Sequence, residues 1–446
     1  MRRAICILMA ICMSVVICTL SLIGCGEKEF VDTSNAVSRN SFDNPDFAKE
    51  QEANDDAAGR EHISIPDDAE TITIDGEQYI PIDNMDDISY VDYDKNFILK
   101  HDIDIRGKGC VAPAKVLSPS STSHDIPFTG KFNGNNYKVY GERGWVLFGY
   151  IKDAEISNLI FSSEMISSLS KTAATGMVLC GIAENSTIKN ITNYSTLGRK
   201  DQATSLGLIL YLYKSTLENV INYGDVVEGS ACIVKYMFDS TVKNCKNYGS
   251  ISYKYQYPIG GIVSEILAHH IPVLASNGEA TATVGSVVEN CENYGNIIGT
   301  SYVGGIVGRV AMYQDAHTIG LTYGQIFYDY FTDISKVKLL SNPSVIKNCT
   351  NYGNLYRDKD YEHSTPNLTV MCCVGGITGL GYQIENCKNN GNIYGFEVVN
   401  PEYTVDYIGG ITGAAVNLSE CTSSTKLVAA SSINHTNDIC GYTIER

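Results

Sequence analysis

Two stretches of the sequence are the strongest candidates for chemistry, one with a pair of histidines and one with aromatic rings, carboxylates and a histidine. The first stretch, about 265–285, contains the adjacent pair His269 and His270. The second stretch, about 309–343, contains Tyr313, Asp315, His317, Tyr323, Tyr328, Asp329 and Tyr330. Rings beside carboxylates on long loops are typical of surfaces that contact a carbohydrate or a protein. Two alternatives remain open: a segment that only packs on the scaffold, and a metal site built from His and Asp.

Motifs with a fixed catalytic spacing do not support an enzyme. The sequence contains no His-Glu-x-x-His, no Gly-x-Ser-x-Gly, no phosphate-binding loop and no Gly-x-Gly-x-x-Gly. The formal net charge of −17 argues against a nucleic-acid partner, which would select a basic surface. We therefore expect no cofactor, no bound metal and no nucleic-acid binding.

A sequence repeat predicts the strands that position these two stretches. One phrase, built around Asn-x-x-Asn-Tyr-Gly, recurs at 186–197, 215–226, 240–251, 286–297, 344–355 and 382–393. A divergent copy at 154–165 and a degraded copy at 416–427 bring the number to eight. A second phrase of the Gly-Ile-Val type alternates with it and begins at 176, 207, 232, 261, 305, 376 and 410. The closest copies lie 25 residues apart, from Asn219 to Asn244. Short β-branched runs at this period predict a stack of coils with parallel strands.

Stacked coils place like residues in columns along the axis. The first asparagine column, a structural ladder of hydrogen-bonded amides, is Asn190, Asn219, Asn244, Asn290, Asn348 and Asn386. A second is Asn193, Asn222, Asn247, Asn293, Asn351 and Asn389. A tyrosine column follows it, and the glycines after these tyrosines (Gly224, Gly249, Gly295, Gly353) are expected to have positive φ. A charged column alternates in sign, as Lys189, Glu218, Lys243, Glu289, Lys347 and Glu385.

Five cysteines occupy one repeat position. They are Cys245, Cys291, Cys349, Cys387 and Cys421, and Ile191 and Val220 fill the same position in earlier copies. Replacement by Ile and Val predicts a buried apolar position and structural thiols. Disulfides and metal ligation are the alternatives, although the sequence contains no Cys-x-x-Cys.

The first 62 residues predict export and anchoring. Arg2 and Arg3 precede an uncharged apolar run over 4–24, and the run ends in Leu-Ile-Gly-Cys25. This ending resembles the bacterial lipobox, which implies that residues 1–24 are removed as a signal peptide and that Cys25 carries a diacylglycerol. A retained transmembrane helix is the alternative. The acidic segment that follows predicts a flexible tether, so that 25–62 is the lipidated Cys with its tether.

The remaining chain resembles a known family of exported proteins. Phe97-Ile-Leu-Lys-His-Asp-Ile-Asp-Ile105, Pro127-Phe-Thr-Gly-Lys-Phe-Asn-Gly-Asn-Asn-Tyr-Lys-Val139 and Leu147-Phe-Gly149 resemble the start of bacterial surface β-helix regions with GLUG-type repeats. Gly-Gly-Ile-Val-Gly308 and Gly-Gly-Ile-Thr-Gly379 resemble the GLUG unit itself. Asn133 and Asn136 stand where the family usually has Asp and His. The resemblance covers roughly 70–446 and implies a fold but no activity.

Together these patterns predict an all-β chain that forms a right-handed parallel β-helix of about eight coils with loop insertions. Residues 63–145 would form an N-terminal cap with the first coils, including a short helix over 82–90. Residues 146–446 would form the repeats and a C-terminal cap. The regular copies carry Asn, Tyr, Thr and alternating Lys and Glu rather than a cluster of acids, so we expect a non-catalytic, adhesin-like surface for a glycan or protein on the extracytoplasmic face of the membrane. A polysaccharide lyase or glycoside hydrolase on the same scaffold is the alternative.

Overall fold

The computed structural model describes the chain from residue 62 to residue 444 with gaps. The described residues are 62–106, 110–112, 126–141, 146–162, 176–198, 205–253, 257–267, 285–311, 344–357, 370–394, 404–425, 427–428 and 435–444. All of them belong to one compact unit, Glu61–Arg446.

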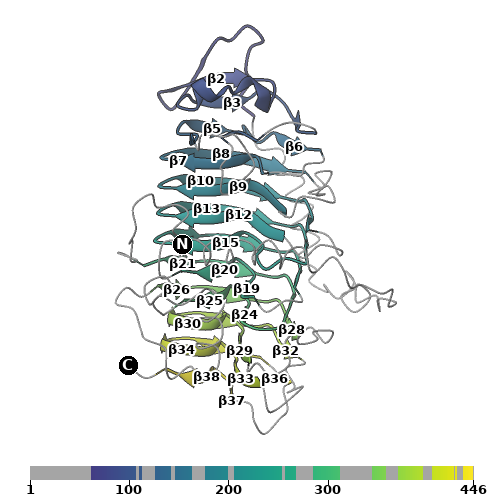
Figure 1. The fold of residues 1–446 in the computed structure, drawn as a ribbon, viewed down its shortest axis with the longest axis vertical. Helices are drawn as coiled ribbons and strands as arrows, with labels where there is room; N and C mark the ends of the chain where they lie inside the picture. Colours follow the sequence, from purple (N-terminus) through teal and green to yellow (C-terminus); the bar gives the residue numbers. More distant parts are fainter. Residues whose placement is uncertain are drawn as a thin grey trace, which may run out of the picture. The chain divides into compact units, whose positions relative to one another are not determined.

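This unit is all-β, as the sequence predicts. Its described residues contain no α-helix, and they form sheets of 26, 7 and 5 strands. Pairing is parallel throughout except between β1 (Ile72–Ile74) and β2 (Glu77–Ile82), which are antiparallel. Figure 1 shows the strands lying one above another in rungs. The long parallel sheets are those expected of a β-helix.

The largest sheet runs through every rung. Its further strands are β3 (Phe97–Leu99), β4 (Ile103–Asp104), β5 (Lys131–Asn133), β6 (Lys138–Tyr140), β7 (Phe148–Lys152), β8 (Glu155–Phe161), β9 (Gly176–Glu184), β10 (Thr187–Asn193), β12 (Ser205–Tyr213), β13 (Thr216–Asn222), β15 (Val234–Phe238), β16 (Thr241–Lys243), β17 (Lys246–Asn247), β20 (Val263–Ile266), β21 (Val287–Glu289), β22 (Glu292–Asn293), β25 (Val307–Val310), β26 (Val345–Lys347), β27 (Thr350–Asn351), β30 (Thr378–Glu385), β31 (Lys388–Asn389), β34 (Thr412–Ser419), β35 (Thr422–Ser423) and β38 (Cys440–Thr443).

Two smaller sheets flank it. One contains β11 (Leu197–Gly198), β14 (Val226–Val227), β18 (Ile251–Ser252), β23 (Ile297–Gly299), β28 (Leu355–Arg357), β32 (Ile393–Tyr394) and β36 (Leu427–Val428). The other contains β19 (Ile259–Gly260), β24 (Val303–Gly304), β29 (Val370–Gly375), β33 (Thr404–Gly409) and β37 (His435–Asn437). The helix expected over 82–90 is not formed, because β2 extends to Ile82 and only two single 3₁₀ turns follow, Met85–Asp87 and Tyr90–Asp92.

Successive copies of the repeat pair in register. Asn193 lies opposite Asn222, Asn222 opposite Asn247, and the same position continues through Asn293, Asn351 and Asn389. The apolar position of the same strands is fully buried in each rung, as Ile188, Leu217, Val242, Val288, Ile346 and Ile384. Each copy therefore contributes one rung, and its branched apolar side chains form the core.

The second asparagine column is a continuous hydrogen-bonded ladder inside the core. The Nδ2 of Asn247 donates to the Oδ1 of Asn293 over 2.8 Å, and the Nδ2 of Asn293 donates to the Oδ1 of Asn351 over 2.8 Å. Each Nδ2 also donates to the carbonyl oxygen two residues later, as from Asn293 to Gly295 over 2.9 Å. Every member from 193 to 389 is fully buried. Because unpaired amides in the core are costly, the ladder fixes the register of one rung on the next.

The two repeated phrases meet at this ladder. A Cβ atom added to Gly305 would lie 2.3 Å from the Cγ of Asn351, and one added to Gly376 would lie 2.0 Å from the Cγ of Asn389. In an earlier rung Cys232 replaces the glycine, and its thiol donates to the Oδ1 of Asn247 over 3.0 Å. At Gly305 and Gly376 the missing Cβ therefore leaves the space that the asparagine side chain opposite occupies.

The glycines after the tyrosines do not have positive φ, contrary to the sequence prediction. Positive φ occurs instead in the first asparagine column, from +57° at Asn190 to +47° at Asn386. Asn is the residue other than Gly that adopts this conformation most readily. The glycines are needed for space, because a Cβ on Gly295 would lie 1.9 Å from the carbonyl oxygen of Gly249 in the preceding rung.

The first asparagine column also carries side-chain contacts between rungs. The Nδ2 of Asn219 donates to the Oδ1 of Asn190 over 3.1 Å, and the Nδ2 of Asn386 donates to the Oδ1 of Asn348 over 2.9 Å. Beside it the tyrosine rings stack, with centroids 4.6 Å apart between Tyr294 and Tyr352. The stacked rings cover one another's faces, so most of the column presents ring edges rather than a platform for a sugar.

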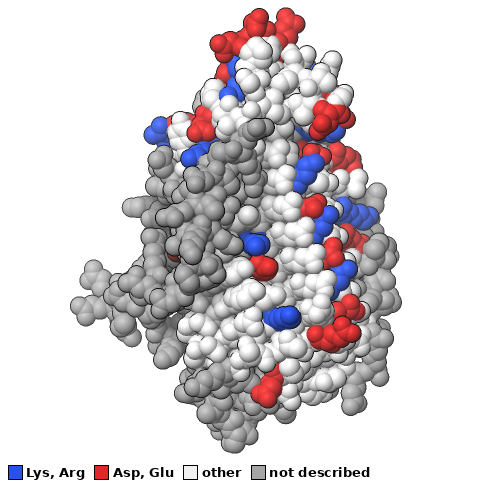
Figure 2. Space-filling view, turned by 180° about the vertical axis from the view of Figure 1, so that it is seen from behind, with Lys and Arg blue, Asp and Glu red and all other residues white. Residues whose placement is uncertain are grey.

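The alternating charges pair along the sheet. Lys189 contacts Glu155 over 2.9 Å, Lys243 contacts Glu218 over 3.0 Å, and Lys347 contacts Glu289 over 3.0 Å. Figure 2 shows positive and negative side chains alternating along this side of the molecule. Exposed pairs of this kind contribute about 0–1 kcal/mol each, so their main effect is to disfavour a slip by one rung.

Removing one amide from the interior ladder tests its contribution. Asn293→Ala leaves the Oδ1 of Asn351 and the carbonyl of Gly295 without their donor, and an unpaired buried group costs about 1–3 kcal/mol. We expect the free energy of unfolding to fall by about 2–4 kcal/mol, measured by urea denaturation. The matched control is Asn290→Gly in the exposed first column, where glycine also accepts positive φ and the change should stay within about 0.5 kcal/mol. Equal urea midpoints for both variants would contradict this role of the ladder.

Candidate functional site

The residues selected from the sequence lie outside the described residues. These are His269 and His270 in the first insertion, the seven residues between Tyr313 and Tyr330 in the second, and the lipidation candidate Cys25. Their predicted roles remain predictions. The structure describes the residues just before and just after each insertion.

The two insertions are rooted side by side. The first follows β20, which ends at Ile266, and the second follows β25, which ends at Val310. The amide of Ala311 donates to the carbonyl oxygen of Ile266 over 2.8 Å, which joins the two points of departure. The amide of Ser286 donates to the Oγ of Ser344 over 3.0 Å, which joins the two points of return. The described ends of the two insertions therefore lie next to each other on neighbouring rungs.

A buried ion pair lies at these roots. Glu265 on β20 is directly opposite Arg309 on β25, and both side chains are 8% exposed. The Nε of Arg309 donates to the Oε1 of Glu265 over 3.0 Å, and its Nη2 contacts the same oxygen. The guanidinium lies 5.1 Å from the centre of the Tyr302 ring. Because loss of either partner would leave a buried charge, the pair locks the register at the base of the insertions.

Lys235 adds a third charge one rung earlier, on β15. It is 3% exposed, and its Nζ donates to the Oγ of Ser264 over 3.2 Å and to the Oγ of Ser230. The Tyr236 and Tyr257 rings lie 5.1 and 5.3 Å from its Nζ. Burial lowers the pKa of Lys235 to about 8, while Glu265 raises it and Arg309 lowers it further. The hydroxyls of two serines and the faces of two tyrosine rings thus stabilise the buried ammonium group of Lys235.

These three charges were missed in the sequence because they do not recur in every copy. A signal was nevertheless present. Glu265 and Arg309 each stand four residues after the first glycine of a Gly-Ile-Val phrase, at Gly261 and Gly305. Opposite charges at one offset in consecutive copies indicate a pair between neighbouring rungs, as they do in the Lys and Glu column.

The cysteine column contains free thiols, which are buried at four of its five positions and partly buried at Cys421. Cys245, Cys291, Cys349 and Cys387 are fully buried, and each thiol donates to the carbonyl oxygen two residues earlier, as from Cys291 to Glu289 over 3.2 Å. Burial raises the pKa of Cys291 and Cys349 well above the ordinary value for a thiol. Since the thiolate is the nucleophile and the metal ligand, these thiols act as packing groups at neutral pH.

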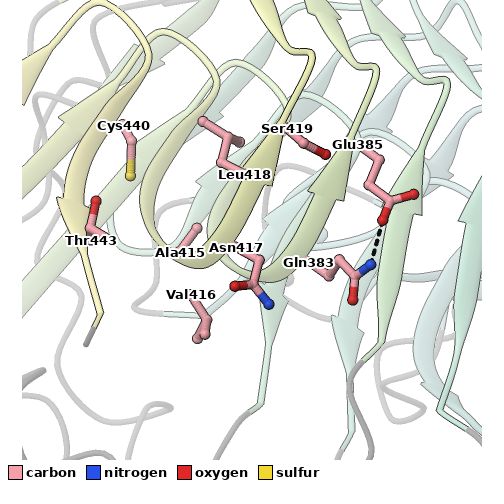
Figure 3. Close-up of a pocket in the computed structure, with 9 residues that line it drawn as sticks. All are labelled: Gln383, Glu385, Ala415, Val416, Asn417, Leu418, Ser419, Cys440 and Thr443. Carbon is pink, nitrogen blue, oxygen red and sulfur yellow. Dashed lines mark hydrogen bonds between the residues drawn. The ribbon is translucent and has the colours of Figure 1, made fainter. Parts of the chain in front are cut away.

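A hollow lies at the last rungs, far along the chain from the insertions. Its volume is about 540 Å³, and Figure 3 shows the nine residues that line it, which come from β30, β34 and β38. The Nε2 of Gln383 donates to the Oε1 of Glu385 at one side, and Cys440 and Thr443 lie at the other. Among the described residues, Ala415 is the last residue of β34 that pairs with β38, and the hollow lies beside the part of β34 that follows it.

Comparisons with known proteins identified no homologue of this chain. A scan against protein-family models gave no match, and a search of curated proteins found none either. Within the described residues, no three His, Cys, Asp or Glu side chains are grouped as metal ligands would be. In the same residues no helix has the length and apolarity needed to cross a membrane.

The lowered pKa of Lys235 predicts a pH-dependent stability. Its folded pKa of about 8 lies below the ordinary value of 10.5, so between these values the unfolded chain binds more protons and this group's contribution to stability rises with pH. Lys235→Met removes the buried ammonium and should raise the free energy of unfolding at pH 7 by up to about 3 kcal/mol. The difference from the parent chain should shrink between pH 8 and 10 in urea unfolding. A difference that does not change with pH would contradict the burial of the ammonium.

Proposed function

We propose that this protein is a lipid-anchored protein of the extracytoplasmic face of a bacterial membrane, with a non-catalytic binding surface for a glycan or a protein. In this proposal residues 1–24 are the signal peptide and Cys25 carries the lipid. Residues 25–62 are the tether, 63–145 the N-terminal cap with the first coils, and 146–446 the coils with a C-terminal cap. The scaffold is a right-handed parallel β-helix of about eight coils with GLUG-type repeats.

The observation that carries the binding role is the common root of the two insertions. Repeat proteins place function on insertions that leave one face of the stack. Here the longest insertions start on paired strands, β20 and β25, above a buried ion pair. A segment with two histidines and a ring-rich segment that start from one place would form a larger contact surface together than either would form alone.

The regular faces support binding rather than catalysis. Their exposed and half-exposed positions carry Asn, stacked Tyr, and Lys and Glu that neutralise one another across rungs. Acid–base cleavage of a polysaccharide would use carboxylates with different environments on neighbouring coils. The paired columns instead give Glu155, Glu218 and Glu289 a lysine partner each. The function therefore rests with the insertions.

Deletion of the second insertion tests the binding surface. A chain in which residues 312–343 are replaced by a short Gly-Ser linker from Ala311 to Ser344 should lose binding on a glycan array and in a whole-cell pull-down. The matched control replaces residues 358–369, a smaller insertion between β28 and β29, and should bind as the parent does. Urea unfolding confirms that both variants keep the fold. Equal binding with and without 312–343 removes this segment as the contact site, and unsaturated products from an acidic polysaccharide would overturn the non-catalytic assignment.

Substitution of the lipidation candidate tests the anchor separately. Cys25→Ala removes the thiol that would accept the diacylglycerol, so metabolic labelling with an alkyne fatty acid should disappear and the protein should leave the membrane fraction. Each acyl CH₂ contributes about 0.8 kcal/mol to membrane binding, so the loss should be nearly complete. The control is Cys18→Ala inside the apolar run, which should keep the label. A label that survives Cys25→Ala would contradict the lipid anchor.

A further inference from the structure

The tyrosine column ends before the repeat does. It consists of Tyr194, Tyr223, Tyr248, Tyr294 and Tyr352, and its rings stack with centroids 4.6–5.0 Å apart and interplanar angles of 6–10°. The rung after Tyr352 has Asn390 at this position. The amide of Asn390 donates to the carbonyl oxygen of Asn351 over 2.8 Å, just as the amide of Tyr352 donates to that of Asn293 over 2.7 Å. Asn390 therefore takes the backbone place of a sixth tyrosine without supplying its ring.

The last ring of the column is exposed as a result. Tyr352 is 43% exposed, whereas Tyr248 in the middle of the column is 3% exposed. Tyr294 covers one face of the Tyr352 ring, with the two ring planes 7° apart. Because the rings are parallel and their spacing is close to the rung spacing, the other face is directed toward the rung of Asn390. We call it the open face of Tyr352.

Polar side chains occupy the rungs beyond the open face. Asn390 and Ser424 follow Tyr352 at the same repeat position, and both are exposed. The Oγ of Ser424 donates to the Oδ1 of Asn390 over 3.4 Å, a contact that does not use the Nδ2 donors of Asn390. Lys388 on β31, two residues before Asn390, is exposed as well. An apolar ring face is thus combined with an amide, a hydroxyl and an ammonium group.

Lys388 interrupts the pairing of charges in its own column. In register this column is Lys246, Glu292, Thr350, Lys388 and Thr422. Lys246 contacts Glu292 over 3.1 Å, whereas Lys388 has a threonine in each adjacent rung. The hydroxyl of Tyr294 donates to the Oε2 of Glu292 over 2.8 Å, so rings of the tyrosine column reach this column within their own rung. A ring placed on Tyr352 in the next rung would by the same geometry meet Lys388.

We propose that the open face of Tyr352 binds one hexuronic acid residue of an acidic polysaccharide. The pyranose ring takes the place of the missing sixth tyrosine ring, with its C–H face on the tyrosine. The sugar carboxylate pairs with the ammonium of Lys388, and the sugar hydroxyls bond with Asn390 and Ser424. A six-membered ring with hydroxyls and one carboxylate matches every one of these groups, whereas an aromatic ligand would use the ring face alone. The inference goes beyond the proposed function, which places binding on the insertions.

A site of this size is weak. One sugar on one tyrosine, with one ion pair and a few hydrogen bonds, predicts a Kd of about 1 mM. Because the charge on Lys388 is exposed, the affinity should fall as the salt concentration rises. Such binding is lost in the washing steps of a glycan array, so it is measured separately from the binding that we attribute to the insertions.

Saturation-transfer nuclear magnetic resonance on the full chain in detergent tests the proposal. The probes are hexamers of galacturonate, of mannuronate and of hyaluronan, with a neutral glucan hexamer as the reference. At least one acidic probe should bind, about tenfold more tightly than the neutral one. Asn390→Tyr supplies the sixth ring, covers Tyr352 and should abolish binding. This variant keeps the fold because five other copies of the phrase have Tyr at the same position.

Two further variants separate the ring from the charge. Tyr352→Ala removes the platform and should weaken binding of the acidic probe at least about tenfold. Lys388→Gln should reduce the affinity for the acidic probe to that for the neutral one. The matched control is Lys246→Gln, in the same column but paired with Glu292, and it should bind as the parent does.

Each outcome decides for or against the site. No binding of any acidic probe overturns the proposal, and so does equal binding of the neutral probe or binding that Asn390→Tyr leaves unchanged. If Tyr352→Ala fails to fold, as judged by urea unfolding, Asn390→Tyr decides the question by itself. A chain without residues 312–343 should bind these probes as the parent does, so failure here leaves the binding role of the insertions to its own experiment.

Discussion

The structure depends on the buried asparagine ladder. Each amide from Asn193 to Asn389 is removed from water and is paired both along the axis and with a carbonyl of its own rung. A slip of one rung would still pair one amide with another, but a shift of one residue within a rung would leave the amides unpaired in the core. The ladder therefore specifies register, while the column of Ile, Val, Leu and Cys supplies most of the apolar burial.

Other features follow from this constraint. The amide of each rung needs space, which the first glycine of the Gly-Ile-Val phrase provides. The turn three residues earlier needs positive φ, which the exposed asparagines adopt. With register fixed, long insertions can be added without disturbing the rungs, because loop closure grows only slowly more costly with length. The rungs after β20 and β25 accept such insertions, and the Glu265–Arg309 pair holds their base.

The sequence was sufficient for the parallel all-β fold and for which residues share a column. Repetition made these features visible, since Asn, Tyr and Lys or Glu recur at one offset in each copy. Two features could not be assigned correctly from the sequence. Positive φ was attributed to Gly295 and its equivalents rather than to Asn290 and its equivalents, because both residue types favour turns and spacing alone does not separate conformation from crowding. The buried Lys235, Glu265 and Arg309 occur once each, so no column revealed them, and the ring-rich segment around Tyr328 remains a prediction.

The central claim is that residues almost 200 positions apart are separated by only a few rungs. Thr187 and Gln383 occupy one column, through Thr216, Thr241, Val287 and Val345. Five steps of about 4.8 Å place them about 24 Å apart. The direct measurement is electron paramagnetic resonance between encoded spin-label amino acids at these two positions. The account predicts a narrow distance distribution near 24 Å, and a broad distribution or one centred beyond about 40 Å would contradict it.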